Sequence, residues 1–233
     1  MVLLIAAGFG PSLAGQSNRN SPATALVIAH GIVLLAWTLL YLTQAAFVAT
    51  GRTAVHRRLG ALGFALATAV IVLGYFAVVG FARRHYDLGG DIIRAISRTG
   101  SPLRDPTAML FPLSELLIFG SLVAAALWYR HRPEIHKRLM LLALLSLATE
   151  PILHLVGHLT IYWPALRGSG GRIAALLTIL LLTVSAIYDR VVNGRVHAVS
   201  LWTPIVAFVW QNVLVFVVLP SALWREIAGR LIR

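Results

Sequence analysis

The stretch PATALVIAHGIVLLAWTLLYLTQAAFVAT, residues 22–50, contains no Asp, Glu, Lys or Arg, and it decides the class of fold. An apolar α-helix needs about 20 residues to cross the roughly 30 Å of hydrocarbon in a bilayer. Ser21 followed by Pro22 is a favourable N-cap and first helical residue. The stretch therefore predicts a membrane-spanning helix.

Further apolar runs of similar length follow, separated by polar connections. Hydrophobic residues make up 58% of the 233 residues, and the mean hydropathy is +0.82. Both values lie far outside the range of soluble domains. We predict an all-α, polytopic transmembrane helical bundle of about six spans arranged as three hairpins. The predicted spans are residues 22–50, 59–80, 109–129, 138–161, 172–189 and 199–219.

The segments outside residues 21–221 are too short or too polar to span. Residues 1–20 begin with an apolar run that lacks the basic residues of a signal peptide, and we expect this segment at the surface. Residues 222–233 form an amphipathic pattern, with Leu223, Trp224, Ile227 and Leu231 opposite basic residues, which predicts a surface helix. The long loop 81–108 contains DIIRAISR, a possible interfacial helix, and is long enough to cover a site as a lid.

The formal net charge is +12, and the Lys and Arg residues lie mainly between the apolar runs. In that position they orient helices and meet anionic headgroups. Membrane lipids are therefore the expected partners, and nucleic acid is not. Positive charge is densest in the short loops after the first, third and fifth spans, which predicts that the HRR and HKR loops are cytoplasmic and both termini outside. The chain has no cysteine, which excludes disulfides, iron–sulfur clusters and thiolate-bound metals.

Three of these loops end in a similar phrase: AVHRRLG at 54–60, EIHKRLM at 134–140 and RVHAVSL at 195–201. The repeat favours three stacked hairpins. In each, the second helix begins near the inner face, at His56, His136 or His197. These histidines are interpreted as interfacial residues. The alternative is a haem near the inner face held by two of them, since bis-histidine ligation needs one residue from each of two packed helices.

The fourth span contains ATEPILHLVGHL, residues 148–159, which places Glu150, His154 and His158 at i, i+4 and i+8 on one helical face. Two imidazoles four residues apart can ligate one metal, and a carboxylate one turn away can be a ligand or a general base. His30 and Glu115 are expected at similar depth in the outer half of the membrane. Burying an ionisable group inside a bilayer costs free energy, which favours the hypothesis that these residues have a function.

The first span supports an inward-facing polar site. His30, Trp37, Tyr41 and Gln44 lie on one stripe of an otherwise apolar helix, and Gln211 and Asn212 of the sixth span are candidates for the same interior. The carboxylates favour Zn, Fe or Cu over haem at this place. A buried hydrogen-bonded network that fixes helix register, or a proton pathway, remains an alternative use of the same side chains.

The phrases HGIVLLAW (30–37), HRRLGALG (56–63) and HRPEIHKRLMLLA (131–143) resemble uncharacterised bacterial multi-pass membrane proteins whose hairpins begin with histidine and arginine. More loosely, residues 28–148 resemble cytochrome b-type membrane proteins and haem-copper oxidase assembly proteins. The resemblance implies a bacterial inner-membrane location and a redox or metal-handling role involving His30, His56 and His136. The chain departs from the two-haem pattern, because four consecutive helices do not carry two matched histidine pairs.

Three functional hypotheses follow. The first is an outer-half site of His30, Glu115, Glu150, His154 and His158 that binds a metal for redox chemistry or for metal-assisted hydrolysis of a lipid-soluble substrate, with Glu150 as the catalytic base. The second is a b-type haem electron-transfer protein, in which His56 and His136 bind the cofactor. The third is a non-enzymatic subunit or assembly factor of a larger membrane complex.

Overall fold

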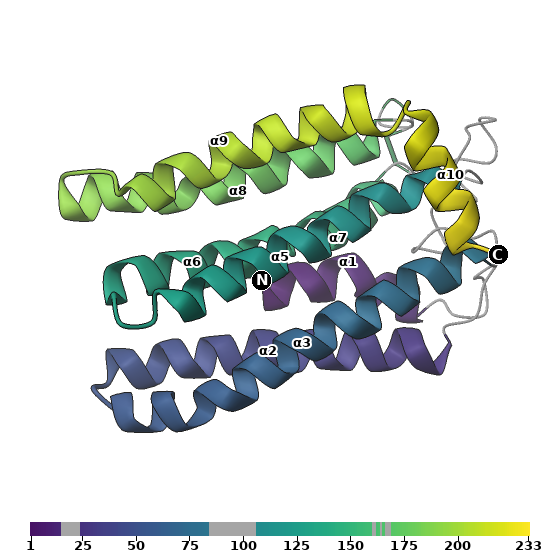
Figure 1. Cartoon of the computed structure of the whole chain (residues 1–233). Helices are drawn as coiled ribbons and strands as arrows, with labels where there is room; N and C mark the ends of the chain where they lie inside the picture. Colours follow the sequence, from purple (N-terminus) through teal and green to yellow (C-terminus); the bar gives the residue numbers. More distant parts are fainter. Residues whose placement is uncertain (15–23, 84–105, 160–161, 164, 166–168) are drawn as a thin grey trace.

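The structure, a computed structural model, describes residues 1–14, 24–83, 106–159, 162–163, 165 and 169–233 (Figure 1). This part of the chain is helical and contains no strand. Six helical segments are long and apolar enough to cross a membrane, so the predicted all-α bundle is confirmed. They are Ala25–Ala49, Thr53–Arg83, Pro106–Trp128, Pro133–Leu159, Gly170–Asn193 and Ala198–Val218.

Consecutive spans pair as hairpins. The first hairpin is α2 (Ala25–Ala49) with α3 (Thr53–Arg83), and the second is α5 (Leu110–Trp128) with α6 (Pro133–Ser146). The third is α8 (Gly170–Asn193) with α9 (Ala198–Val213). In Figure 1 the three hairpin turns lie at one end of the bundle, here called the hairpin end, and both α3 and α8 pack against the second hairpin.

Local sequence explains several helix boundaries. The Thr24 hydroxyl caps α2 by accepting a hydrogen bond from the Val27 amide, 3.4 Å away. Gly51, in the turn between α2 and α3, has φ +76°, and Gly194, which ends α8, has φ +69°. Side chains strongly disfavour this left-handed region, so glycine allows both chain reversals. Pro133 begins α6, where its missing amide hydrogen costs little.

The fourth span is interrupted near its middle. Helix α6 ends at Ser146, and α7 (Thr149–Leu159) continues after a turn at Leu147 and Ala148. Pro151 lies in the first turn of α7, where it cannot donate a hydrogen bond to the carbonyl four residues earlier. The break divides the span into a half near the hairpin end that carries His136 and a half farther from it that carries Glu150, His154 and His158.

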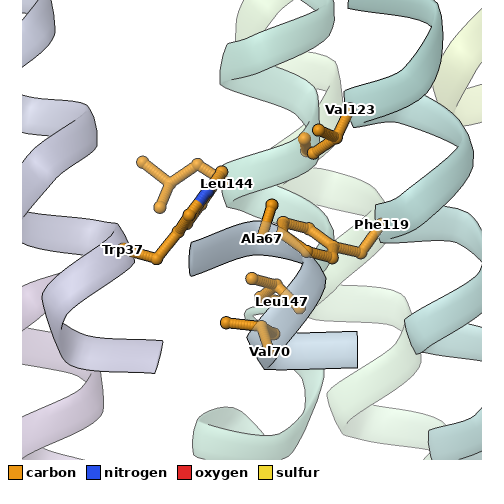
Figure 2. Close-up of a cluster of buried hydrophobic side chains, with 8 residues drawn as sticks. Trp37, Ala67, Val70, Phe119, Val123, Leu144 and Leu147 are labelled. Atoms are coloured by element: carbon orange, nitrogen blue, oxygen red, sulfur yellow. The ribbon is translucent and has the colours of Figure 1, made fainter. Parts of the chain in front are cut away.

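The main hydrophobic core joins the first two hairpins. Trp37 of α2 packs with its ring centroid 4.9 Å from that of Phe119 of α5, at an angle of 84° between the ring planes. Figure 2 shows Ala67 of α3 and Leu144 of α6 beside them, so four helices meet at this cluster. The remaining buried members are Val70, Val123, Ala143 and Leu147. Aromatic pairs of this geometry add about 0.5–1.5 kcal/mol beyond their buried area.

The N-terminal apolar run forms α1 (Val2–Ala14), which packs into the bundle against α7. Met1 and Leu4 contact the buried cluster of Ala148, Ile152, Val156 and Ala174. One side of α1 is thus covered by α7, whereas Leu3 is 84% exposed. Sequence composition alone does not reveal that pairing.

The C-terminal tail forms α10 (Ala222–Leu231), which crosses the end of the bundle opposite the hairpin end (Figure 1). A π-helical segment, η4 (Leu214–Val218), precedes it, and the short 3₁₀ helix η2 (Pro106–Met109) lies beneath it. The surface helix is thus confirmed. Its inward residues are Trp224 and Ala228, whereas Leu223 is 68% exposed. The predicted helix DIIRAISR and most of the predicted lid lie outside the described residues.

Candidate functional site

An eight-residue pattern occurs at the start of both α3 and α6. Residues 52–59 read RTAVHRRL and residues 132–139 read RPEIHKRL, with arginine, histidine, arginine and leucine at matching places. The His56 amide donates to the Arg52 carbonyl at 3.2 Å, and the His136 amide donates to the Arg132 carbonyl at 3.0 Å. Both histidines therefore occupy the same position, one turn into the second helix of a hairpin.

The two histidine side chains meet between the first and second hairpins. The ring centroids of His56 and His136 are 6.2 Å apart, and the ring planes make an angle of 76°. Both side chains are partly buried, and both lie near the hairpin end of the bundle. The repeated sequence thus brings two imidazoles from different hairpins to one place.

Hydrogen bonding distinguishes the two rings. His136 Nδ1 is 2.8 Å from the Ala126 carbonyl oxygen of α5. Because a carbonyl oxygen can only accept, Nδ1 is the donor, and in the neutral ring the lone pair is then on Nε2. His56 Nδ1 is buried and has no hydrogen-bond partner among the described residues. A buried ring nitrogen without a partner is unusual, and a water, an ion or a ligand can satisfy it.

The third histidine of the repeat has a different role. His197 precedes α9, and its Nδ1 accepts a hydrogen bond from the Val199 amide at 3.2 Å, so it acts as a helix cap. Its own amide donates to Asp189 Oδ2 at 3.3 Å. The third phrase therefore resembles the other two in sequence but does not place its histidine at an equivalent helical position.

A buried ionic network that begins two residues after His136 joins the second and third hairpins. Arg138 of α6 donates through Nε to Asp189 Oδ2 of α8 at 2.9 Å, and its Nη2 donates to Oδ1. Asp189 also accepts from the Ser200 hydroxyl at 2.6 Å and from Asn193 Nδ2 at 2.9 Å. Glu134 accepts from Arg138 Nη1 at 2.7 Å. These bonds fix the orientation of the first turns of α6, which carry His136.

The predicted outer-half residues fall into separate groups. The side chains of Thr149 and Glu150 of α7 lie close enough to the Glu115 carboxyl of α5 to interact with it electrostatically. Two of the five predicted ligands are thus neighbours. Both are partly buried, at the break in the fourth span.

His154 and His158 of α7 contact α1. The His154 ring centroid lies 4.5 Å from that of Phe9, with the ring planes at 52°. His158 Nε2 is 3.2 Å from the Gly8 carbonyl oxygen. Both histidines therefore lie on the side of α7 that α1 contacts.

His30 of α2 packs at the contact with α3 and α5. A β-carbon built on Gly74 would lie 3.0 Å from His30 Cε1 and 2.8 Å from a methyl group of Leu116. His30 Nδ1 has no hydrogen-bond partner among the described residues. Within this part of the chain, no group of three or more His, Cys, Asp or Glu side chains is arranged to hold a metal ion.

The polar stripe predicted on the first span faces inward. Trp37 is buried, and its ring stacks with that of Tyr41 at a centroid distance of 6.2 Å. Gln44 Oε1 is buried as well. Asn212 behaves differently, because its side-chain amide donates to the Phe208 carbonyl of its own helix at 2.8 Å, in an exposed position.

Sequence reasoning identified His56 and His136 but missed two features that set their environment. The Arg138–Asp189 pair joins residues 51 positions apart, and its sequence signal is a lone acidic residue near the end of an apolar span. The bond from His136 to the Ala126 carbonyl has no sequence signal, since every residue except proline offers the same backbone groups. Similarity offers no help with function, because no protein family, no curated protein and no solved structure matches this chain.

Proposed function

We propose that His56 and His136 are the two axial ligands of a b-type haem and that the chain transfers electrons in the membrane. The observation that carries this proposal is the 6.2 Å separation of the two ring centroids. Two imidazoles on opposite sides of one metal ion have ring centres about 6 Å apart, because each metal–nitrogen bond is about 2 Å long and each ring centre lies roughly 1 Å beyond its nitrogen. The 76° angle between the planes is compatible, since each ring can rotate about its bond to the metal.

The number of protein ligands favours haem over a bare metal ion at this pair. A structural zinc site takes four protein ligands, and a catalytic one takes three. Glu134 is the acidic residue nearest to His136 in sequence, and it is bound to Lys137 at 2.8 Å and to Arg138 at 2.7 Å. A porphyrin supplies four nitrogen ligands itself, so two histidines complete the coordination.

The neighbouring residues prepare the pair for this role. The bond from Nδ1 to the Ala126 carbonyl directs the lone pair of His136 Nε2 away from α5 and raises its strength as a ligand. Arg138, held by Asp189, keeps the first turns of α6 in one orientation. A bound haem would supply reversible one-electron chemistry. Its reduction potential would depend on burial and on the hydrogen bonds made by the histidine ligands.

The decisive experiment is a visible spectrum of the detergent-purified chain, oxidised and dithionite-reduced. We expect a Soret band, with α and β bands on reduction, and we expect His56→Ala or His136→Ala to abolish them. His131→Ala is the matched control, because His131 is exposed in the same hairpin turn and contacts Arg130. An unchanged spectrum in both ligand variants, or a colourless native chain, contradicts the proposal.

The electrostatic interaction between Glu115 and Glu150 supports a second candidate, the outer-half metal site. Here Zn, Fe or Cu would be bound by these carboxylates with histidines of α7, for redox chemistry or hydrolysis. Elemental analysis of the same preparation tests it. We expect about one metal per chain that is lost in His154→Ala, and a metal content unaltered by that change excludes the site. A chain with neither haem nor metal would fit a non-enzymatic subunit.

A further inference from the structure

Two arginines stand in equivalent positions beside the histidine pair. Arg52 precedes His56 by four residues, and Arg132 precedes His136 by four residues. The backbone bonds at 3.2 Å and 3.0 Å show that each pair is one helical turn apart. Arg52 directly precedes α3, and Arg132 is the N-cap of α6, so each arginine stands just before the helix that carries its histidine. Each arginine therefore lies on the side of its histidine nearer to the hairpin end.

The charges of these two arginines are not neutralised by the described residues. Glu134 is bound to Lys137 and Arg138, and Asp189 is bound to Arg138. The Arg132 guanidinium lies over the Tyr129 ring, 5.9 Å from its centroid. Both side chains are exposed at the hairpin end. A guanidinium group without an acidic neighbour can bind an anionic group through charge-assisted hydrogen bonds.

We propose that Arg52 and Arg132 bind the two carboxylates of the ligand held between His56 and His136. This inference rests on the proposed function, and for a b-type haem the carboxylates are the propionates. A planar ligand with one histidine on each face lies roughly parallel to α3 and α6, so one of its edges points toward the hairpin end. The arginines flank that edge. A haem bound in this way would have its propionates at the hairpin end, beside Arg52 and Arg132, and its apolar edge inside the bundle.

The same guanidinium groups can attract another anion, the phosphate of a membrane lipid. The shared chemistry is a negatively charged oxygen group, and the two sources differ in how they depend on the haem. Propionate binding makes haem affinity depend on free carboxylates. If the arginines bind a lipid phosphate instead, haem affinity does not depend on whether the carboxylates are free.

The test compares two ligands on the full-length chain in detergent. Apoprotein is titrated with haem b and with its dimethyl ester, in which both propionates are neutral, and the Soret band is followed. We expect haem b to bind at least about tenfold more tightly, since a charge-assisted hydrogen bond contributes roughly 1.5–3 kcal/mol. The double variant Arg52→Gln/Arg132→Gln should bind both ligands with equal affinity. Arg58→Gln is the matched control, because Arg58 lies about 200° around α3 from His56.

Each outcome decides the inference. Equal binding of the two ligands by the native chain overturns it and favours a lipid phosphate at the arginines. A preference for haem b that survives in the double variant overturns it as well. A native chain that binds neither ligand refutes the proposed function itself. Should the double variant fail to fold, the comparison of the two ligands on the native chain still decides.

Discussion

Arg138 of α6 and Asp189 of α8 form a buried ion pair between the second and third hairpins, with side-chain exposures of 8% and 2%. Asp189 keeps four partners, namely Arg138, Ser200, Asn193 and the His197 amide. We predict that Asp189→Leu lowers the free energy of unfolding by about 3–5 kcal/mol, because it leaves a buried guanidinium without its main counter-charge. Thermal unfolding in detergent measures the change.

The double variant Arg138→Met/Asp189→Leu tests whether Asp189→Leu destabilises the protein by removing an attraction or by leaving the Arg138 charge buried without a partner. It should recover most of the lost stability, since two apolar side chains of similar volume often replace a buried ion pair without net cost. The control is Arg230→Met, which removes an exposed pair with Glu226 and should cost less than about 1 kcal/mol. Equal effects of Asp189→Leu and Arg230→Met would show that burial does not govern the first pair.

Gly8 of α1 sets the distance between α1 and α7. A β-carbon at this position would lie 2.4 Å from the Pro151 carbonyl oxygen and 2.9 Å from Pro151 Cα, and backbone atoms cannot move aside cheaply. We predict that Gly8→Val destabilises the docked helix by about 1–3 kcal/mol, the usual effect of overpacking. Faster amide hydrogen exchange in residues 2–11 would report the loss of docking.

Gly10 provides the matched control for this change. A β-carbon on Gly10 meets no atom within 4 Å, so Gly10→Val makes the same alteration of helix propensity without the clash. Hydrogen exchange in α1 should remain as in the native chain. If both variants speed exchange equally, the contact between Gly8 and Pro151 is not what holds α1 in place.

Trp224 anchors α10 across the end of the bundle. Its indole Nε1 donates to the Thr107 carbonyl at 2.9 Å, and the ring packs with Val78, Met109 and Leu214. We predict that Trp224→Ala costs about 3–5 kcal/mol and releases α10, because a large buried aromatic leaves a cavity that cannot close fully. Tryptic cleavage after Arg225 and Arg230 should then accelerate. Trp202→Ala, at a position 59% exposed, should leave cleavage unchanged.

Features that depend on neighbouring residues in the sequence were predictable. Hydropathy is a local property, so the six spans and their hairpin pairing were predictable from runs such as residues 22–50. The stripe of His30, Trp37 and Tyr41 was predictable for the same reason, since helical periodicity fixes which residues share a face. The histidine repeat at 56 and 136 was visible, but only the packing of the first hairpin against the second brings the rings together.

Long-range partners were not predictable in this way. The spacing of Glu150, His154 and His158 placed them on one face of α7, but it did not indicate that α1 contacts two of them. Pro151 was a signal for the break in the fourth span that a hydropathy profile ignores. Asp189 meets Arg138 across two hairpins, and no local rule selects that partner.

The absence of cysteine permits a direct test of membrane orientation. Ala54 is exposed at the hairpin end, Ala222 is exposed at the opposite end, and Leu117 is 60% exposed in the middle of α5. We propose that the hairpin end is cytoplasmic, because short Lys- and Arg-rich loops remain on that side. With a membrane-impermeant maleimide, Ala222→Cys should react in intact cells and Ala54→Cys only after permeabilisation. Leu117→Cys should react in neither case, since lipid covers it.

The three single-cysteine variants act as controls for one another. The reverse pattern for Ala54→Cys and Ala222→Cys would show that the arginine-rich turns face outward, and it would move the histidine pair to the outer surface. Reaction of Leu117→Cys in intact cells would show that water reaches α5, contrary to a lipid-facing span. Placing His56 and His136 on the cytoplasmic side also determines which soluble electron donors can reach a haem bound there.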